Sequence, residues 1–366
     1  MSESLLTDIT DLSISLLTTS VSLVILAQTL KITGFEKNEK NPITVTPILG
    51  GLSNFLYVLE NETNKKIIAR LSAHTNLPPG SNLIDQTLLL NSLPDSLAPR
   101  ALGSIENVRF ESFVNSLGTL TISEFRSLNF ASEIGRVLGV MHLSNSISLF
   151  KSPPTLLSRL FTITKLAGKD LLLQAEKLSQ RYLTDTEICD ADQEIISQVF
   201  QSRGCSSNSL IIHGAALYAN FLVQSKTIQS PRLSLLDFEY AISAPLIEAI
   251  GFEIGNILCE FSINYETKDA PGYLMLPSTT LPPCNWRNAL ISGWANEVIG
   301  PSGTQIQRDC LERVAHIAAK LGMQHSHLFW SSWSRLIAKE SKNTSTVFNY
   351  ETFSIERLAR LKTLIS

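Results

Sequence analysis

Two residues suited to holding a divalent cation flank a predicted β-hairpin in the second half of the chain. The hydrophobic runs at 221–223 and 233–236 are expected to form its strands, on either side of a turn near 228–229. An antiparallel hairpin folded there pairs positions whose numbers sum to about 457, which brings Asn220 and Asp237 side by side at its open end. An amide oxygen and a carboxylate are hard ligands of the kind that bind Mg²⁺. The spacing therefore predicts a magnesium site at that end of the hairpin.

A glycine-containing turn near the N-terminus could hold the phosphates of a nucleotide. Strands are expected at 43–45, 55–59 and 66–71, and the first two enclose the pair Gly50-Gly51. Backbone amides in such a turn can approach phosphates closely, because glycine carries no side chain. A glycine pair alone marks any turn. Combined with the hairpin ligands, it favours a kinase-like phosphotransferase that uses ATP and Mg²⁺.

The elements that must position these groups change character along the chain. Residues 1–40 are expected to be mostly helical, and a helix at 82–93 precedes a strand at 108–114. Beyond these, we expect helices over 123–200 and 308–366 and a strand at 209–212. The pattern predicts an α+β protein whose strands lie mainly in its first third.

The composition excludes several classes of function. Of the 366 residues, 44% are hydrophobic and the formal net charge is −3, so no basic excess exists to neutralise nucleic-acid phosphates. The uncharged stretch 12–30 is too rich in Ser, Thr and Gln to supply the roughly 20 apolar residues of a membrane span. We expect it to form a buried or amphipathic helix without a transmembrane segment, with a membrane role as the minor alternative. The five cysteines are odd in number and widely spaced, which favours reduced thiols in a cytoplasmic protein.

Motifs along residues 45–362 resemble those of the choline/ethanolamine kinase family, which is related to the aminoglycoside phosphotransferases. In order, they are Gly50-Gly51-Leu52-Ser53-Asn54, Ile68-Ala69-Arg70-Leu71, Phe110-Glu111-Ser112-Phe113-Val114, Leu235-Leu236-Asp237-Phe238-Glu239-Tyr240, Gly251-Phe252-Glu253-Ile254-Gly255-Asn256, Cys259-Glu260-Phe261 and Phe329-Trp330-Ser331-Ser332-Trp333. The resemblance implies a two-lobed, protein-kinase-like fold. Its small N-terminal lobe, residues 1–114, would carry an antiparallel sheet, and its larger C-terminal lobe, residues 115–366, would be mainly helical.

The resemblance also implies a nucleotide site beneath the glycine turn. Arg70 matches the strand cation that contacts the nucleotide phosphates in this family, and Asp85 falls where the family has a helix Glu. Residues 110–114 resemble the hinge that receives adenine. The residues predicted to bind ATP are Gly50, Gly51, Ser53, Asn54, Arg70, Asp85, Glu111 and Val114. Asn220 and Asp237 would hold Mg²⁺.

A pocket for an ammonium group is implied by the same resemblance. Glu260 matches the family's carboxylate near the cation of the ligand, and four aromatic residues match positions around it: Tyr265, Trp330, Trp333 and Tyr350. A quaternary ammonium donates no N–H bonds, so aromatic faces hold it by cation–π attraction. A primary ammonium needs more acceptors than Glu260 alone supplies. The pocket therefore slightly favours choline over ethanolamine.

The sequence departs from the family at the position that matters most for catalysis. The family's catalytic loop has an Asp that orients and deprotonates the substrate hydroxyl, and Ala215 stands there, between His213 and the retained Asn220. Loss of a positioned general base typically lowers a rate by about 10²–10⁴-fold. The sequence predicts impaired or absent phosphotransfer, with rescue by another acid such as Glu239 as a lesser possibility.

Two functions remain open at this stage. The first is an ATP- and Mg²⁺-dependent choline/ethanolamine kinase of phospholipid head-group metabolism that acts slowly or with an unrecognised base. The second is a non-catalytic pseudokinase that binds nucleotide or choline and regulates a partner, as a homodimer or as a heterodimer with an active paralogue. Ala215 is the residue that separates them.

Overall fold

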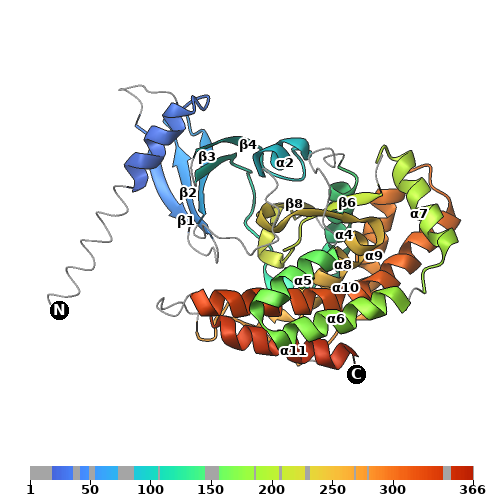
Figure 1. The fold of residues 1–366 in the computed structure, drawn as a ribbon. Coiled ribbons are helices and arrows are strands. Elements are labelled where there is room, and N and C mark those ends of the chain that lie inside the picture. Colours follow the sequence, from blue (N-terminus) through green and yellow to red (C-terminus); the bar gives the residue numbers. More distant parts are fainter. Residues whose placement is uncertain are drawn as a thin grey trace. The chain divides into compact units, whose positions relative to one another are not determined.

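The computed structural model has an α+β fold with a small antiparallel sheet and a mainly helical remainder (Figure 1). It describes residues 19–35, 42–48, 54–72, 86–105, 108–144, 156–184, 187–205, 208–226, 231–267, 269–277, 280–340 and 348–365. The chain divides into two compact units. Unit 1 contains residues 1–77, 85–91 and 99–115, and unit 2 contains the rest.

Unit 1 is built on a five-stranded sheet of order β1-β2-β3-β5-β4, in which neighbouring strands run antiparallel. The strands are β1 (Thr44–Ile48), β2 (Asn54–Glu60), β3 (Lys66–Ser72), β4 (Ala101–Ile105) and β5 (Val108–Ser112), and the unit also contains most of α2 (Gln86–Ser92). The predicted strands at 43–45, 55–59, 66–71 and 108–114 are therefore confirmed within a few residues. Strand β4 was not among the predicted strands.

The N-terminal hydrophobic stretch packs on this sheet. Residues 19–29 are helical, and the helix buries Leu23 and Ala27 against a core that includes Leu59 and Phe110. Burial of this stripe confirms an amphipathic helix for the described half of the stretch 12–30. No helix in the described part of the chain is long and apolar enough to cross a membrane.

Unit 2 is mainly helical. Its helices are α3 (Ile122–Phe125), α4 (Leu128–His142), α5 (Leu156–Ala167), α6 (Lys169–Thr184), α7 (Asp190–Ser202), α8 (Leu246–Glu260), α9 (Cys284–Ile299), α10 (Gln305–Glu340) and α11 (Tyr350–Ile365). Three short antiparallel pairs accompany them: β6 (Ser209–Ile212) with β9 (Ile242–Pro245), β7 (Phe221–Ser225) with β8 (Arg232–Leu235), and β10 (Ile263–Asn264) with β11 (Leu274–Met275). The predicted strand at 209–212 and the helical tail are confirmed.

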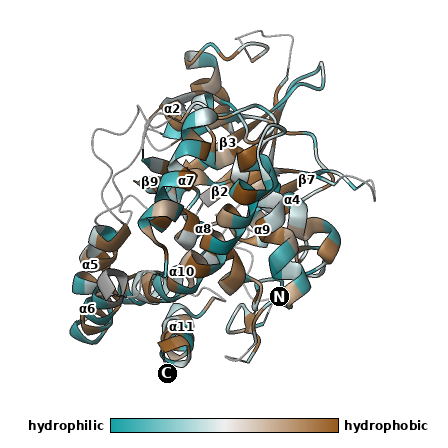
Figure 2. Cartoon of the chain, turned by 90° about the vertical axis from the view of Figure 1, so that its right-hand side faces the viewer, coloured by the Kyte–Doolittle hydropathy of each residue, from teal (hydrophilic) through white to brown (hydrophobic). Residues whose placement is uncertain are grey.

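Helix α8 forms the centre of unit 2. Thirteen of its 15 residues are buried, and most of these are apolar, as the brown colouring of α8 in Figure 2 shows, although Glu253, Asn256 and Glu260 are buried with them. It crosses α10 closely, because a β-carbon on Gly251 would lie 2.7 Å from the carbonyl oxygen of Ala318 and one on Gly322 would lie 1.8 Å from that of Gly251. These glycines permit the close crossing, which explains part of the Gly251–Asn256 motif in packing terms.

Candidate functional site

Half of the residues predicted to bind nucleotide lie outside the described residues. These are Gly50, Gly51, Ser53 and Asp85. Of the others, Asn54 begins β2 and pairs with Ser72 of β3. Val114 lies two residues beyond the end of β5. Their assignment to ATP binding stays a prediction.

Arg70 and Glu111 form a buried ion pair between adjacent strands. The Nε of Arg70 donates to Oε1 of Glu111 at 3.1 Å, and the Nε of Arg109 donates to the same oxygen at 2.8 Å. Burial alone would raise the pKa of Glu111, but the two guanidinium groups hold that pKa below its ordinary value. The Glu111 side chain therefore fixes the strand cation from β5. Glu111 was predicted to belong to the hinge, and its pairing with Arg70 was not predicted.

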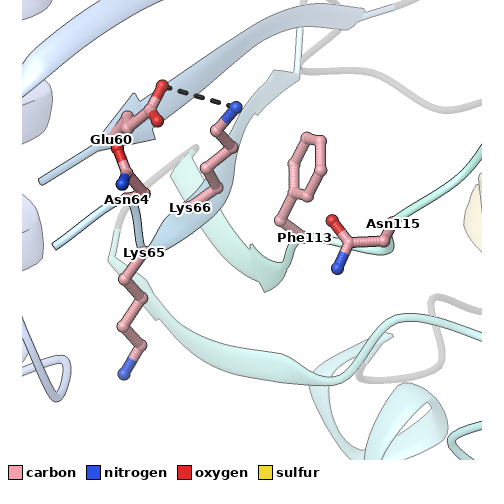
Figure 3. Close-up of a pocket in the computed structure, with 6 residues that line it drawn as sticks. All are labelled: Glu60, Asn64, Lys65, Lys66, Phe113 and Asn115. Atoms are coloured by element: carbon pink, nitrogen blue, oxygen red, sulfur yellow. Dashed lines mark ion pairs between the residues drawn. The ribbon is translucent and has the colours of Figure 1, made fainter.

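An open pocket of about 570 Å³ lies at one end of the same sheet (Figure 3). It is lined by Glu60, Asn64, Lys65, Lys66, Phe113 and Asn115. Figure 3 shows Lys66 extending toward Glu60, with which it pairs at 3.4 Å, while Lys65 points away. None of the predicted site residues lines this pocket, although Phe113 and Asn115 flank Val114.

Residues 213–220, which were predicted to match the family's catalytic loop, are held by hydrogen bonds at several points. The Nε2 of His213 lies 2.6 Å from the carbonyl oxygen of Leu236, and Nδ2 of Asn220 donates to the carbonyl oxygen of Ala215 at 3.0 Å. Gly214 has a φ of +80°, and a β-carbon there would lie 2.4 Å from the carbonyl oxygen of Tyr240. The loop thus has a defined conformation, and Ala215 is 6% exposed within it.

Two residues of α8 support this loop in ways that the sequence analysis did not predict. Oε2 of Glu253 accepts from the backbone N–H of His213 at 2.6 Å, and burial raises the pKa of this carboxyl to about 7. Nδ2 of Asn256 donates to the carbonyl oxygen of Ala216 at 3.1 Å, while its Oδ1 accepts from Nε1 of Trp330 at 3.0 Å. Asn256 therefore joins the loop to the aromatic residues of α10. Both residues belong to the motif Gly251-Phe252-Glu253-Ile254-Gly255-Asn256, and this motif was the signal in the sequence that could have indicated a role for them.

Asn220 and Asp237 lie at the open end of the β7–β8 hairpin, as the spacing predicts. Near the turn, Ser225 pairs with Arg232, and their numbers sum to 457. A bulge between Val223 and Ser225 then shifts the register by one, so that Phe221 pairs with Leu235, a sum of 456. Asn220 therefore faces Leu236, whose N–H donates to the Asn220 carbonyl at 2.8 Å, and Asp237 is one residue further along. Asp237 has a left-handed backbone, with φ of 67°. The predicted register was wrong by one at this end, because the bulge adds a residue.

This end of the hairpin offers the donor set that a hard cation requires. The amide nitrogen of Asn220 is engaged with the Ala215 carbonyl, which leaves its oxygen as the atom suited to a metal. Asp237 contributes a carboxylate, and both side chains are partly exposed. No cluster of three or more His, Cys, Asp or Glu residues with metal-binding geometry occurs among the described residues. An oxygen-rich Mg²⁺ site completed by phosphates and water fits these residues.

Three of the four predicted aromatic residues come together in one cluster at α10 and α11, while Tyr265 lies against Tyr218, Phe348 and Phe353. The rings of Trp330 and Trp333 lie 5.5 Å apart between centroids, and Trp333 lies 5.7 Å from Tyr350. Tyr240, which the sequence analysis did not assign to the pocket, lies 5.2 Å from Trp330 and 6.1 Å from Trp333 at steep interplanar angles of 69° and 82°. The rings of Tyr240, Trp330 and Trp333 thus stand steeply to one another, in the way that the walls of an aromatic cage do.

Glu260 has a partner that the sequence analysis missed. Its Oε1 accepts from Arg357 of α11, and its Oε2 accepts from the hydroxyl of Tyr265 at 2.9 Å. The ion pair is deeply buried, because the side chain of Arg357 is 1% exposed and that of Glu260 is 3% exposed. The guanidinium of Arg357 also lies 5.1 Å from the centroid of the Phe353 ring. A cation of the chain itself thus already neutralises the carboxylate predicted to attract an ammonium group.

Comparison with known proteins agrees with the fold and the motifs. A family model described as "Choline/ethanolamine kinase" matches residues 45–362. The chain belongs to the choline/ethanolamine kinase family. Similar curated proteins include a choline/ethanolamine kinase of Homo sapiens, 23% identical over 308 residues that cover 82% of this chain and 75% of the human protein. A choline/ethanolamine kinase of Rattus norvegicus is also 23% identical, over 313 residues and with the same coverage.

Solved structures of family members share the fold. The choline kinase of Cryptosporidium parvum superposes with a TM-score of 0.69 at 19% identity, covering 94% of this chain and 95% of that one. An ethanolamine kinase of Plasmodium vivax gives a TM-score of 0.58 at 15% identity, covering 89% and 83% respectively. These similarities confirm the predicted kinase-like fold class.

Proposed function

We propose that this choline/ethanolamine kinase family member binds ATP, Mg²⁺ and an amino-alcohol of phospholipid head-group metabolism, and that its phosphotransfer is impaired or absent. The observation that carries the proposal is the state of the loop around Ala215. Asn220 and Asn256 donate hydrogen bonds to its backbone carbonyls and Glu253 accepts one from its backbone, yet the position of the general base carries only a methyl group. The loop keeps the support for catalysis and lacks the residue that performs it.

The remaining acids near the loop are poorly suited to replace the base. Glu253 is fully buried and faces the backbone amide of His213, so it supports the loop from behind. Glu239 lies in the short helix Phe238–Tyr240 directly after Asp237, and it stays the candidate for a rescue. Bound Mg²⁺ would neutralise charge on the transferred phosphoryl group, with Asn220 and Asp237 as its protein ligands. Such positioning without a base is compatible with a slow residual kinase.

The surroundings of Glu260 support choline as the preferred amino-alcohol. Both oxygens of this carboxylate already accept hydrogen bonds, from Arg357 and from Tyr265. A primary ammonium such as that of ethanolamine would need acceptors for three N–H groups. A quaternary ammonium needs only aromatic faces, which Tyr240, Trp330 and Trp333 supply.

A phosphotransfer assay on matched variants tests the proposal. Ala215→Asp restores a carboxylate at the base position, and Ala215→Asn has nearly the same shape without a basic oxygen. We expect choline phosphorylation with Mg-ATP to rise by about 10²–10⁴-fold in Ala215→Asp and to stay at the native level in Ala215→Asn. Equal rates in the two variants would contradict a missing base.

The second candidate function is a pseudokinase that regulates a partner, as a homodimer or with an active paralogue. The loop around Ala215 supports this candidate, because it is held in place but lacks a general base. Binding of nucleotide or choline requires the scaffold alone and no general base. This candidate would be favoured if the protein co-purified with an active paralogue and if phosphotransfer by the native protein did not exceed the background rate. The slow-kinase alternative requires native turnover above background that depends on Asp237.

A further inference from the structure

Two thiols of unit 2 meet at one carboxylate. All five cysteines of the chain carry free thiols, and Cys189 is exposed whereas Cys310 is only 6% exposed. The Sγ of Cys189 donates to Oδ2 of Asp192 at 3.2 Å, and the Sγ of Cys310 donates to Oδ1 of the same side chain at 3.6 Å. The two sulfurs are therefore separated by no more than one carboxylate and two hydrogen bonds, although the cysteines lie far apart in the sequence.

The cluster joins the start of α7 to the start of α10. Cys189 is the N-cap residue of α7, and its backbone N–H also donates to Oδ2 of Asp192 in the first turn of that helix. Cys310 belongs to α10, and its Sγ also lies 3.9 Å from the carbonyl oxygen of Asp192. Arg313, one turn further along α10, forms an ion pair with the same carboxylate. Contacts from both helices thus fix the positions of the two thiols.

The two thiols differ in their environments. Burial raises the pKa of Cys310 to about 11, and Asp192 and Cys189 add to this effect, so the Cys310 thiol stays protonated at neutral pH. The thiolate is the form that attacks a disulfide, and access decides which of two thiols meets an oxidant first. Cys189 is exposed and would therefore react first, with Cys310 beside it as the second thiol of the pair.

We propose that Cys189 and Cys310 form a disulfide when the protein meets a small-molecule disulfide such as oxidised glutathione, and that this bond links α7 to α10. In the first step the Cys189 thiolate attacks one sulfur of oxidised glutathione, which releases one glutathione and leaves a mixed disulfide. Cys310 then loses its proton and attacks Sγ of Cys189, and the second glutathione leaves. In total the two cysteines give up two electrons and two protons, and oxidised glutathione is reduced to two thiols.

Such a bond should change stability more than ligand binding. It would close a long loop between α7 and α10, and a disulfide across a long loop typically stabilises a protein by constraining its unfolded chain. Trp330 of the aromatic cluster lies in the same helix as Cys310, but roughly 30 Å further along the axis. The thiol pair is thus separate from the candidate site, and the inference goes beyond the proposed function and does not depend on it.

Oxidation of the full-length protein in glutathione buffers tests the proposal. The native protein, Cys189→Ser, Cys310→Ser and the control Cys284→Ser would be incubated at graded ratios of oxidised to reduced glutathione. Remaining thiols would be alkylated and the peptides mapped by mass spectrometry without reduction, and thermal unfolding of the same samples would follow stability. Cys284 is the matched control, because it is also exposed and also lies at the start of a helix, α9.

We expect the native protein and Cys284→Ser to yield a peptide pair linked through Cys189 and Cys310, with a mass two hydrogen atoms below that of the reduced form. Their melting temperatures should rise by about 4–16 °C on oxidation. Neither change should occur in Cys189→Ser or Cys310→Ser, and the latter should keep one glutathione on Cys189.

The native protein alone can overturn the proposal, so the test survives a variant that fails to fold. If Cys189 of the native protein takes up glutathione and the link to Cys310 never closes, the two thiols do not act as a pair. A link that forms only after the protein has been denatured would equally refute the proposal, because the folded chain would then not bring the sulfurs together.

Discussion

The buried ion pair between Arg357 and Glu260 offers the sharpest test of how the predicted ammonium pocket is organised. Replacement of Arg357 by Met leaves Glu260, which is 3% exposed, with the Tyr265 hydroxyl at 2.9 Å as its remaining donor among the described residues. Breaking a buried pair in this way typically costs about 3–5 kcal/mol, because an uncompensated charge stays inside. In a domain of roughly 150–250 residues, slightly smaller than unit 2, each kcal/mol of lost stability lowers the melting temperature by about 2–4 °C. We therefore expect the melting temperature of unit 2 to fall by about 6–20 °C.

A double-mutant cycle distinguishes the pair from simple loss of packing. Glu260→Gln alone leaves the guanidinium of Arg357 with His327, whose Nδ1 lies 3.3 Å from Nη1, and with the Phe353 ring. In the double variant neither charge remains, so its destabilisation should be smaller than the sum of the two single effects by at least about 1–3 kcal/mol. Thermal and denaturant unfolding of the four proteins measures this coupling. Additive effects, or a cost below about 1 kcal/mol for Arg357→Met, would refute the closed pair.

Three further predictions concern the cluster and the loop. Trp330→Leu should weaken choline binding by roughly 2- to 30-fold, from about 0.5–2 kcal/mol per aromatic face, and ethanolamine binding by less, as calorimetry can measure. The raised pKa of Glu253, about 7, means that its contribution to stability is complete below its unfolded pKa and is lost as the pH rises through 7. The unfolding free energy should accordingly fall by roughly 1–3 kcal/mol between pH 5 and 8, and Glu253→Gln should remove most of this slope. Gly214→Ala should destabilise unit 2 by about 1–3 kcal/mol, since φ is +80° and the Tyr240 carbonyl blocks a β-carbon; an unchanged melting temperature would contradict this.

Strongly patterned elements of the fold could be predicted from the sequence. The strands of unit 1 are rich in β-branched and aromatic residues, and β2 and β3 were placed correctly within one or two residues. By contrast, β4 contains Gly103 with a register shift beside it, and β9 consists of Ile-Ser-Ala-Pro. Neither carries a strand pattern of its own, and both are extended because they pair with β5 and β6. Pairing with a neighbouring strand, and not the local sequence, therefore determines the conformation of β4 and β9.

The candidate site was predictable where its geometry depends on local spacing. Asn220 and Asp237 could be placed together because a hairpin with a short turn relates them, although the bulge near Ser225 changed the register by one residue. The partners of Glu260 and Glu111 were not predictable in this way. Arg357 is 97 residues from Glu260, and Arg70 is 41 residues from Glu111, so only the folded chain brings each pair together.

The central claim concerns Ala215, and the turnover number of the native protein tests it most directly. With saturating choline and Mg-ATP, kinases typically turn over at about 1–100 s⁻¹. Because the loop is held in place but lacks a base, we predict a native rate lower by about 10²–10⁴-fold, or no turnover at all. A rate within the ordinary kinase range would contradict the account and would require another acid, such as Glu239, to act as the base.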